Sequence, residues 1–157
     1  MKQEGGQNWT PITPPEGSIF HAETHYLERL GFPQSSEDLG RHRLLDKLHG
    51  NDLLGWSDVL ASPASDKVCD CVAFRSDDFE ALNSAAIAGM GIALLPAWVS
   101  GPSIKAGELI RIRLDDEPWN DKPPGIHLLR ALQEPSAKVR VFTERLKASI
   151  GSPPIWS

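Results

Sequence analysis

The amino-acid sequence predicts an α/β fold in which a mixed β-sheet is flanked by helices. The first observation is the run from Asp77 to Trp98, where a helix pattern, a glycine and a short apolar strand follow one another without interruption. The second is the alternation of strand-like and helix-like stretches along the rest of the chain. Because several connections are too short for a parallel crossover, some strands should run antiparallel, and the sheet is expected to be mixed.

The run from Asp77 to Trp98 begins with a capped helix. Ser76, Asp77 and Asp78 offer side-chain oxygens to the first amides of that helix. The apolar positions recur at intervals of three and four, as on one helix face: Phe79, Leu82, Ala86 and Met90. We therefore expect a helix from about residue 78 to residue 88 with this face in the core.

Gly89 is expected to end the helix in the left-handed conformation, which costs glycine nothing. The following stretch, Ile92 to Leu95, is apolar at every position and is closed by Pro96. A strand without a polar face is typically buried on both sides, so this strand should lie inside the sheet.

On the amino-terminal side we expect five further elements. They are a strand at 18–21, a helix from Thr24 to Gly31 with Tyr26, Leu27 and Leu30 inward, a capped turn bearing Leu39, and strands at 44–45 and 68–74. On the carboxy-terminal side we expect a turn of helix at 98–100, strands at 109–114 and 126–129, and a helix from Ser136 to Gly151. Residues 47–67 show no clear pattern, and residues 115–124 should form a loop.

Composition restricts the partners. The chain has 157 residues, of which 40% are hydrophobic and 24% charged, as is usual for a soluble globular domain. Its net charge of −5 opposes binding to a phosphate backbone, so we expect no DNA binding by this chain alone. It contains neither an apolar run long enough to cross a bilayer nor a signal-peptide pattern, and we expect no membrane partner and a cytoplasmic location.

The candidate chemical groups favour neither a metal nor a catalytic site. His21 and His25 lie four residues apart and could form a metal-binding face with Glu28, but surface histidines are the better interpretation, since zinc requires three or four converging ligands. Cys69 and Cys71 lack a second cysteine pair and are expected to be reduced thiols on one strand face. No nucleophile elbow or phosphate-binding glycine loop occurs. We therefore predict no enzyme, no metal and no cofactor.

Several segments together resemble one protein family. The run EAL, paired alanines, AG, GIA, LLP and W between Glu80 and Trp98 resembles the signature of the effector-binding domain of LysR-type transcriptional regulators. The flanking segments agree with that family in order. They are YLERLG with Pro33, EDLG with His42, GEL at 107–109, the strand at 125–129 and SAKVRVF at 136–142. The resemblance covers residues 18 to 150.

This resemblance implies a type 2 periplasmic-binding-protein-like fold with two α/β subdomains and a ligand between them. Residues 1–17 are then expected to be a disordered arm and residues 18–122 the effector-binding second subdomain. Residues 123–151 would form the last strand and helix of the first subdomain, and residues 152–157 a tail. The opening elements of the first subdomain and a winged helix-turn-helix have no counterpart in the sequence. We therefore expect the carboxy-terminal portion of a regulator, which would reach DNA only through a helix-turn-helix domain.

The amino end of the helix at 78–88 is the predicted ligand site. Free amides and the positive end of the helix dipole favour an anion there, and in the resembling family this helix start faces the cleft between the two subdomains. We predict effector contacts from Ser76 and Phe79, with Asp77 and Asp78 close by, and a small, possibly carboxylate effector. The alternative is that the acidic residues only cap the helix and repel an anion.

Two other functions remain open on the sequence. A solute-binding receptor of a transport system would share the fold, and a truncated gene product would have no function of its own. Self-association is also expected, because the final strand and helix would leave a set of apolar residues poorly covered: Ile126, Leu128, Val139, Phe142 and Leu146.

Overall fold

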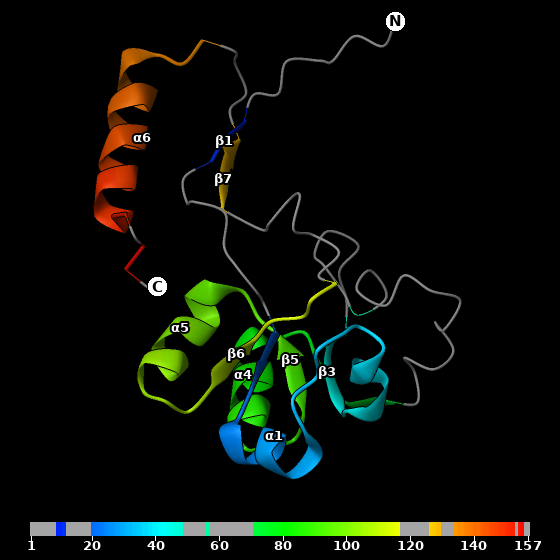
Figure 1. The fold of residues 1–157 in the computed structure, drawn as a ribbon. Coiled ribbons are helices and arrows are strands. Elements are labelled where there is room, and N and C mark those ends of the chain that lie inside the picture. Colours follow the sequence, from blue (N-terminus) through cyan, green and yellow to red (C-terminus); the bar gives the residue numbers. More distant parts are fainter. Residues whose placement is uncertain are drawn as a thin grey trace, which may run out of the picture. The chain divides into compact units, whose positions relative to one another are not determined.

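The structure is a computed structural model, and it describes residues 9–11, 20–48, 56, 71–116, 126–129, 134–152 and 154–155. The described helices and strands are labelled in Figure 1. In chain order they are β1 (Trp9–Pro11), β2 (Phe20–Ala22), α1 (Thr24–Leu30), the 3-10 helix η1 (Asp38–Arg41), β3 (Leu44–Lys47), β4 (Val72–Ser76), α4 (Phe79–Ile87), β5 (Ile92–Leu94), α5 (Ala97–Lys105), β6 (Ile110–Ile112), β7 (His127–Leu129) and α6 (Ala137–Ile150).

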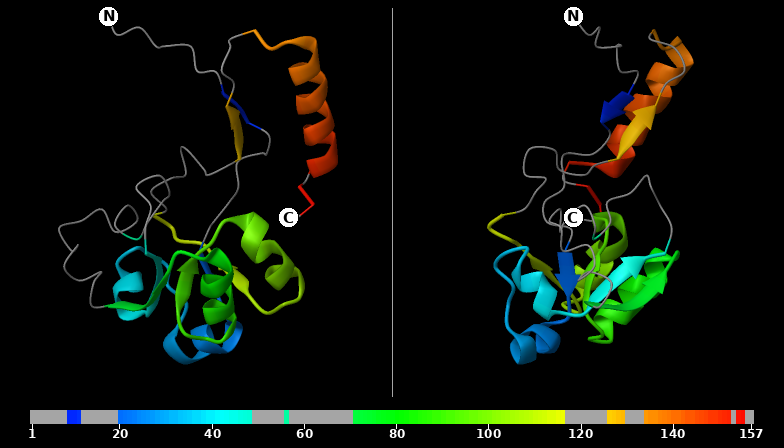
Figure 2. Two further views of the ribbon diagram at one scale, coloured as in Figure 1. Left: turned by 180° about the vertical axis from the view of Figure 1, so that it is seen from behind. Right: turned by 90° about the vertical axis from the view of Figure 1, so that its right-hand side faces the viewer.

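The chain divides into two compact units. Unit 1 is drawn from Met1–Glu16 and Lys122–Ile155, and unit 2 from Gly17–Asp121. In unit 1, β1 pairs antiparallel with β7, and α6 follows as one helix; Figure 2 shows the paired strands side by side. Unit 2 holds a sheet of five strands in the order β4-β3-β5-β2-β6.

The sheet of unit 2 is mixed, as predicted. Strand β3 runs parallel to both β4 and β5, whereas β2 runs antiparallel to β5 and β6. The central position of β5 and the burial of all three of its residues confirm the prediction of an internal strand. The α/β fold class is therefore confirmed.

The sheet of unit 2 has a hydrophobic cluster on each face, because successive strand residues point to opposite faces. Leu44 and Ile92 join a cluster on one face that contains Tyr26 and Leu27 of α1. Leu45 and Ala93 join a second cluster on the other face, which α4 covers with Leu82, Ala85 and Ala86. Each face thus has its own helices, and β5 contributes to both.

Helix α4 has the predicted ends and the predicted buried face, except at Met90. Asp78 is its N-cap, and Gly89 has a φ of 69°, so both ends lie where the sequence placed them. Leu82 and Ala86 are buried, but Met90 is 39% exposed. Met90 comes after the helix has ended, so the helical spacing that placed it inward no longer applies.

One further expectation about the core needs correction. Leu30 was expected inward, but it is the last residue of α1 and is 53% exposed. In α6, Val139 and Phe142 are 39% and 60% exposed, in agreement with the expectation that they are poorly covered, whereas Ile150 is buried. The inward face of a short or terminal helix depends on what packs against it, and periodicity alone does not reveal that.

Two elements were missed. Residues 1–17 were expected to be a disordered arm, yet Trp9–Pro11 forms β1; the rest of that stretch lies outside the described residues. The turn expected at 98–100 is the full helix α5, despite Gly101 and an internal Pro102. Gly101, Ser100 and Ser103 are buried, so small side chains let α5 pack closely, and tertiary packing overrides poor helix propensity.

Candidate functional site

The candidate site lies at the carboxyl edge of three parallel strands. Because β3, β4 and β5 run in the same direction, their carboxyl ends meet at one edge of the sheet. Helix α4 starts directly after β4, and α5 starts directly after β5, so the amino ends of both helices lie at this edge as well. In open α/β sheets this edge is where ligands bind.

The four predicted site residues occupy the turn from β4 into α4. Ser76 is the last residue of β4, Asp78 is the N-cap and Phe79 is the first residue of the helix. Ser76 and Phe79 are half-buried, whereas Asp77 and Asp78 are exposed. These four residues therefore lie together in the structure, which follows from their being consecutive in the sequence.

The polar groups of this turn already serve the helix. The Asp78 backbone N–H donates to Ser76 Oγ at 3.1 Å, and the Glu80 N–H donates to Asp78 Oδ1 at 2.9 Å. The amides of Asp78 and Glu80 therefore have acceptors within the chain, and the expectation that the amides here are unpaired is wrong for these two. Asp78 has the capping role that sequence reasoning weighed as the alternative.

Lys47 is a candidate site residue that sequence reasoning missed. Its Nζ lies 4.8 Å from the centroid of the Phe79 ring, a cation–π contact. Lys47 ends β3 and is registered with Ser76 of β4, so it stands beside the predicted residues. Lys47 is the first residue of the stretch 47–67, which showed no clear sequence pattern. The polar pair Asp46–Lys47 directly after an apolar strand is the signal that could have identified it.

The charges at this edge are mixed. Arg75 Nε lies 3.4 Å from Asp46 Oδ2, so the neighbouring strand ends are joined by an ion pair. Lys47 places a positive charge on the aromatic ring of Phe79, next to the exposed carboxylates of Asp77 and Asp78. An anion approaching Lys47 and the helix end would be attracted, whereas one approaching the two carboxylates would be repelled.

Strand β2 begins, and strand β6 ends, at the same edge of the sheet. Phe20, the first residue of β2, is registered with Leu94 at the end of β5 and with Ile112 at the end of β6. The chain therefore enters and leaves the sheet of unit 2 on the edge that carries the candidate site.

The histidines do not form a metal face. His21 lies in β2 and is fully buried, with its Nε2 3.2 Å from Ser100 Oγ, so the interpretation as a surface histidine is wrong for this residue. His25 is exposed and its Nδ1 lies 2.9 Å from Glu28 Oε2, a contact that raises the pKa of His25. In the described part of the chain, no group of three or more His, Cys, Asp or Glu side chains is gathered as metal ligands would be.

The Ser100–His21 contact has the atoms of a nucleophilic pair but not the access. Both side chains are completely buried between β2 and α5, and Ser100 Oγ also lies 3.4 Å from Pro96 O. The pair satisfies polar atoms inside the fold. Cys71 is a free, half-buried thiol whose Sγ lies 3.2 Å from Gly40 O; Cys69 lies outside the described residues.

Comparison with known proteins agrees with this fold. The regulatory domain of CrgA, a LysR-type transcriptional regulator from Neisseria meningitidis, matches with a TM-score of 0.58 and 20% identity, covering 96% of this chain and 72% of that one. Full-length AphB, the virulence activator of Vibrio cholerae, matches with a TM-score of 0.58 and 19% identity, covering 94% and 49%. At such identities the likeness concerns the fold, which is the type 2 periplasmic-binding-protein-like class.

The sequence comparisons are more specific. The description "LysR substrate binding domain" matches residues 6–151, and the chain therefore belongs to that family. An uncharacterised HTH-type transcriptional regulator of Haemophilus influenzae is 32% identical over 93 residues, which are 59% of this chain and 32% of that protein. The aligned part is thus about a third of that relative. Within the described ranges, no helix is both long and apolar enough to cross a membrane.

Proposed function

We propose that this chain is the effector-sensing part of a LysR-type transcriptional regulator. The observation that carries the proposal is the family match over residues 6–151, which includes both units. The domain acts by binding a small molecule, without catalysis and without a cofactor. Binding shifts the population of conformations, and that shift changes how the regulator contacts DNA.

The proposed effector contacts are Ser76, Asp77, Asp78 and Phe79, with Lys47 added from the structure. Support comes from their position at the carboxyl edge of parallel strands and at a helix amino end, where the dipole favours an anion by about 0.3–1 kcal/mol. Lys47 supplies the full positive charge that the turn itself lacks, and Phe79 supplies an aromatic surface. A small carboxylate with an apolar or aromatic body fits this combination.

Contact with DNA belongs to a helix-turn-helix domain, of the type named in the Haemophilus influenzae relative, and not to these residues. The net charge of −5 supports this division, because DNA-binding surfaces are basic. A regulator that acts on DNA in this way works in the cytoplasm.

A thermal-shift screen against small carboxylates tests the proposed site. A compound present at about ten times its Kd stabilises the folded state by about 1.4 kcal/mol and raises the melting temperature accordingly. We expect Ser76→Ala and Lys47→Ala to reduce the shift produced by the same compound. Ser84→Ala is the matched control, since Ser84 is exposed on the same helix away from the amino end. Equal shifts in all four proteins would exclude this turn as the effector site.

A further inference from the structure

Residues 40–42, at the end of η1, form a short stretch that is fixed on both sides. Before it, Leu39 is fully buried in the core of unit 2. After it, the Arg43 carbonyl accepts the Ile92 N–H at 2.8 Å, and it lies so close to Gly91 that a side chain on that glycine would collide with it. A rearrangement of residues 40–42 can therefore leave both the core and the sheet in place.

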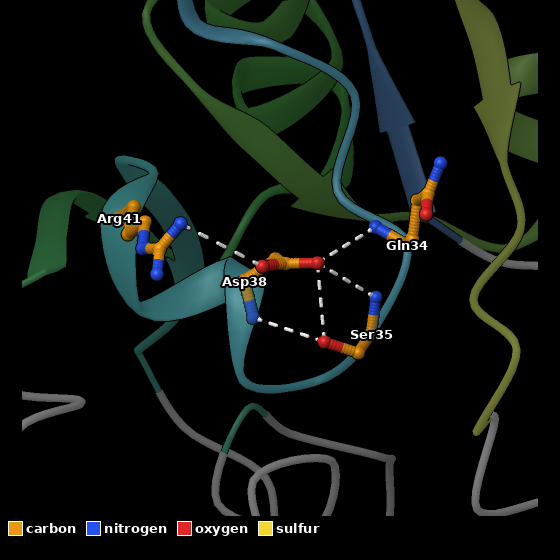
Figure 3. Close-up of polar contacts among 4 residues, drawn as sticks. All are labelled: Gln34, Ser35, Asp38 and Arg41. Carbon is orange, nitrogen blue, oxygen red and sulfur yellow. Dashed lines mark hydrogen bonds and ion pairs between the residues drawn. The ribbon is translucent and has the colours of Figure 1, made fainter.

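The amino end of η1 is held by the Asp38 carboxylate. One of its oxygens accepts the N–H groups of Gln34 and Ser35 and the Ser35 hydroxyl, each at 3.1 Å, and Arg41 Nη1 lies 4.0 Å from the other oxygen (Figure 3). The Gln34 N–H is the main reason that the pKa of Asp38 lies below its usual value of 3.8. This carboxylate therefore stays charged, and keeps its hydrogen bonds, above about pH 5.

His42 ends the stretch with a ring that its surroundings accept only in the neutral form. The residue is buried, and its ring centroid lies 5.8 Å from that of Tyr26. Its Nδ1 is buried without a hydrogen-bond partner among the described residues. A neutral imidazole can keep one nitrogen as a bare acceptor, whereas an imidazolium carries a proton on both nitrogens. A protonated ring in this place would bury an unpaired N–H, which is unfavourable.

One contact joins this stretch to the start of β4. The Cys71 thiol lies directly before β4 and donates to Gly40 O with an Sγ–O distance of 3.2 Å. Cys71 is half-buried and packs against the core cluster that contains Leu39. Gly40 lies two residues before His42, so outward movement of the His42 ring takes the acceptor away from the thiol.

We propose that His42 is an acid-operated latch: when its ring takes up a proton from solvent it leaves the core, and residues 40–42 move away from Cys71 while β3 and β5 stay paired. The stretch is short and lies at the edge of the fold, so it opens at a lower free-energy cost than the sheet. The latch is independent of the effector and of its site.

The other groups around His42 in the described part of the chain keep their charge in the range where the latch works. Burial raises the pKa of Tyr26 above its usual value of 10.0, and Asp38 stays ionised. Arg41 and Arg43 are always protonated. Burial lowers the pKa of His42 below 6.5, an effect that Asp38 opposes, so opening is expected as the pH falls below that value.

Thiol labelling tests the latch in the Cys69→Ser chain, where Cys71 is the one remaining cysteine. The reagent 4,4′-dithiodipyridine reacts with thiols at acid and at neutral pH, and each rate is divided by that of the urea-unfolded chain at the same pH. We expect this ratio to rise at least about fivefold between about pH 7.5 and pH 5, because each pH unit below the pKa of the ring changes the open population by up to tenfold. His42→Phe and His42→Gln should abolish the rise. His25→Gln removes an exposed histidine and is the matched control, which should keep the rise.

Amide hydrogen exchange of the unchanged chain locates the opening and needs no substitution. After correction for the intrinsic effect of pH, protection of the Gly40 and His42 amides should fall with the same midpoint as the NMR titration of the His42 ring, while the Ile92 and Ala93 amides stay protected. A rise in labelling that persists in both His42 variants would overturn the proposal. So would a ring that takes up its proton without loss of protection at Gly40 and His42, or an equal loss of protection in β5.

Discussion

His42 is a buried titratable residue whose charge the fold does not accommodate. It is 5% exposed, its ring centroid lies 5.8 Å from that of Tyr26, and its Nδ1 has no hydrogen-bond partner among the described residues. Burial lowers the pKa of His42 below its usual value of 6.5, and the nearby Asp38 carboxylate opposes this only in part. The folded state therefore prefers the neutral imidazole.

The stability contributed by His42 should depend on pH with a definite sign. A group whose folded pKa is lowered contributes fully above its unfolded pKa, and the contribution is lost as the pH falls from 6.5 toward the lowered value. We expect the unfolding free energy to fall on acidification over this range, and to fall less in His42→Phe. Urea unfolding at a series of pH values measures it.

His25 provides the control of opposite sign. Its pKa is raised by Glu28, so its contribution is present at acid pH and is lost as the pH rises through the folded pKa. His25→Gln should steepen the loss of stability on acidification, if only slightly, because His25 is exposed. A pH dependence unchanged by His42→Phe would show that His42 takes up its proton without cost.

Trp56 donates a hydrogen bond to a main-chain carbonyl of β3 at the point where the pairing of β3 with β4 is irregular. The register of β3 with β4 shifts between Leu44 and Leu45, and the Trp56 Nε1–H donates to Leu45 O at 2.8 Å. The indole is 1% exposed and stacks on Phe20 with ring centroids 5.7 Å apart. Trp56 thus belongs to the core, although the sequence around it showed no clear pattern.

Trp56→Phe should destabilise the chain by about 1–3 kcal/mol, because it leaves a buried carbonyl without its donor and removes ring volume. Trp98→Phe is the matched control, since Trp98 is 40% exposed, and it should change the unfolding free energy by less than about 0.5 kcal/mol. Chemical denaturation followed by circular dichroism compares the two. Equal losses would mean that the indole hydrogen bond is dispensable.

Single residues could be predicted where local chemistry decides their role. Asp78 and Gly89 were identified because a cap and a helix stop depend on neighbouring residues only. His21 could not be identified as buried, because its environment comes from Ser100, which lies 79 positions away. Lys47 was missed for the same reason, since its place beside Phe79 depends on strand pairing.

Among the described helices and strands, α6 carries the most exposed large apolar side chains. Val139, Val141 and Phe142 are 39%, 63% and 60% exposed, and Ile155 beyond the helix is 69% exposed. Exposed large apolar side chains that gather on one element often mark a surface for another chain or segment. We expect the chain to self-associate, as the sequence also suggested.

Sedimentation at micromolar concentration should show dimers or larger species. Phe142→Glu should shift the distribution toward monomer, because it places a charge in the contact. Glu144→Gln, on the same helix, is the control for a change of charge at an already polar, exposed position. A stable monomer of the unchanged chain would show that the apolar side of α6 is covered within the chain.

Elements with a strong local pattern were predicted, and those that depend on distant partners were not. The succession of helix α4 and strand β5 was predicted from the capping residues, the apolar periodicity and the glycine that ends the helix. Strand β1 contains Pro11 and becomes a strand only by pairing with β7, more than a hundred positions later. Helix α5 contains Gly101 and Pro102, and its helical state follows from packing that no local pattern encodes.

At the scale of the whole molecule, the topology gathers several chain ends at one edge of the unit 2 sheet. Three parallel strands end there and two helices begin there, and β2 begins and β6 ends at the same edge. The α/β class and the order of the segments could be predicted because each helix and strand is indicated by the pattern of its own stretch of sequence. The division of strands into parallel and antiparallel pairs, and hence the composition of the edge, required the three-dimensional structure.

The most direct test of the account is an amide NMR titration of the ¹⁵N-labelled chain with small carboxylates, including aromatic ones. We predict that the resonances of Ser76, Asp78 and Phe79 shift first, together with Lys47, at concentrations around a millimolar, since an exposed turn buries too little of a ligand for tight binding. Ser76→Ala should reduce these shifts. Saturable shifts centred instead on His25 and Glu28, with Ser76 to Phe79 unmoved, would contradict the account.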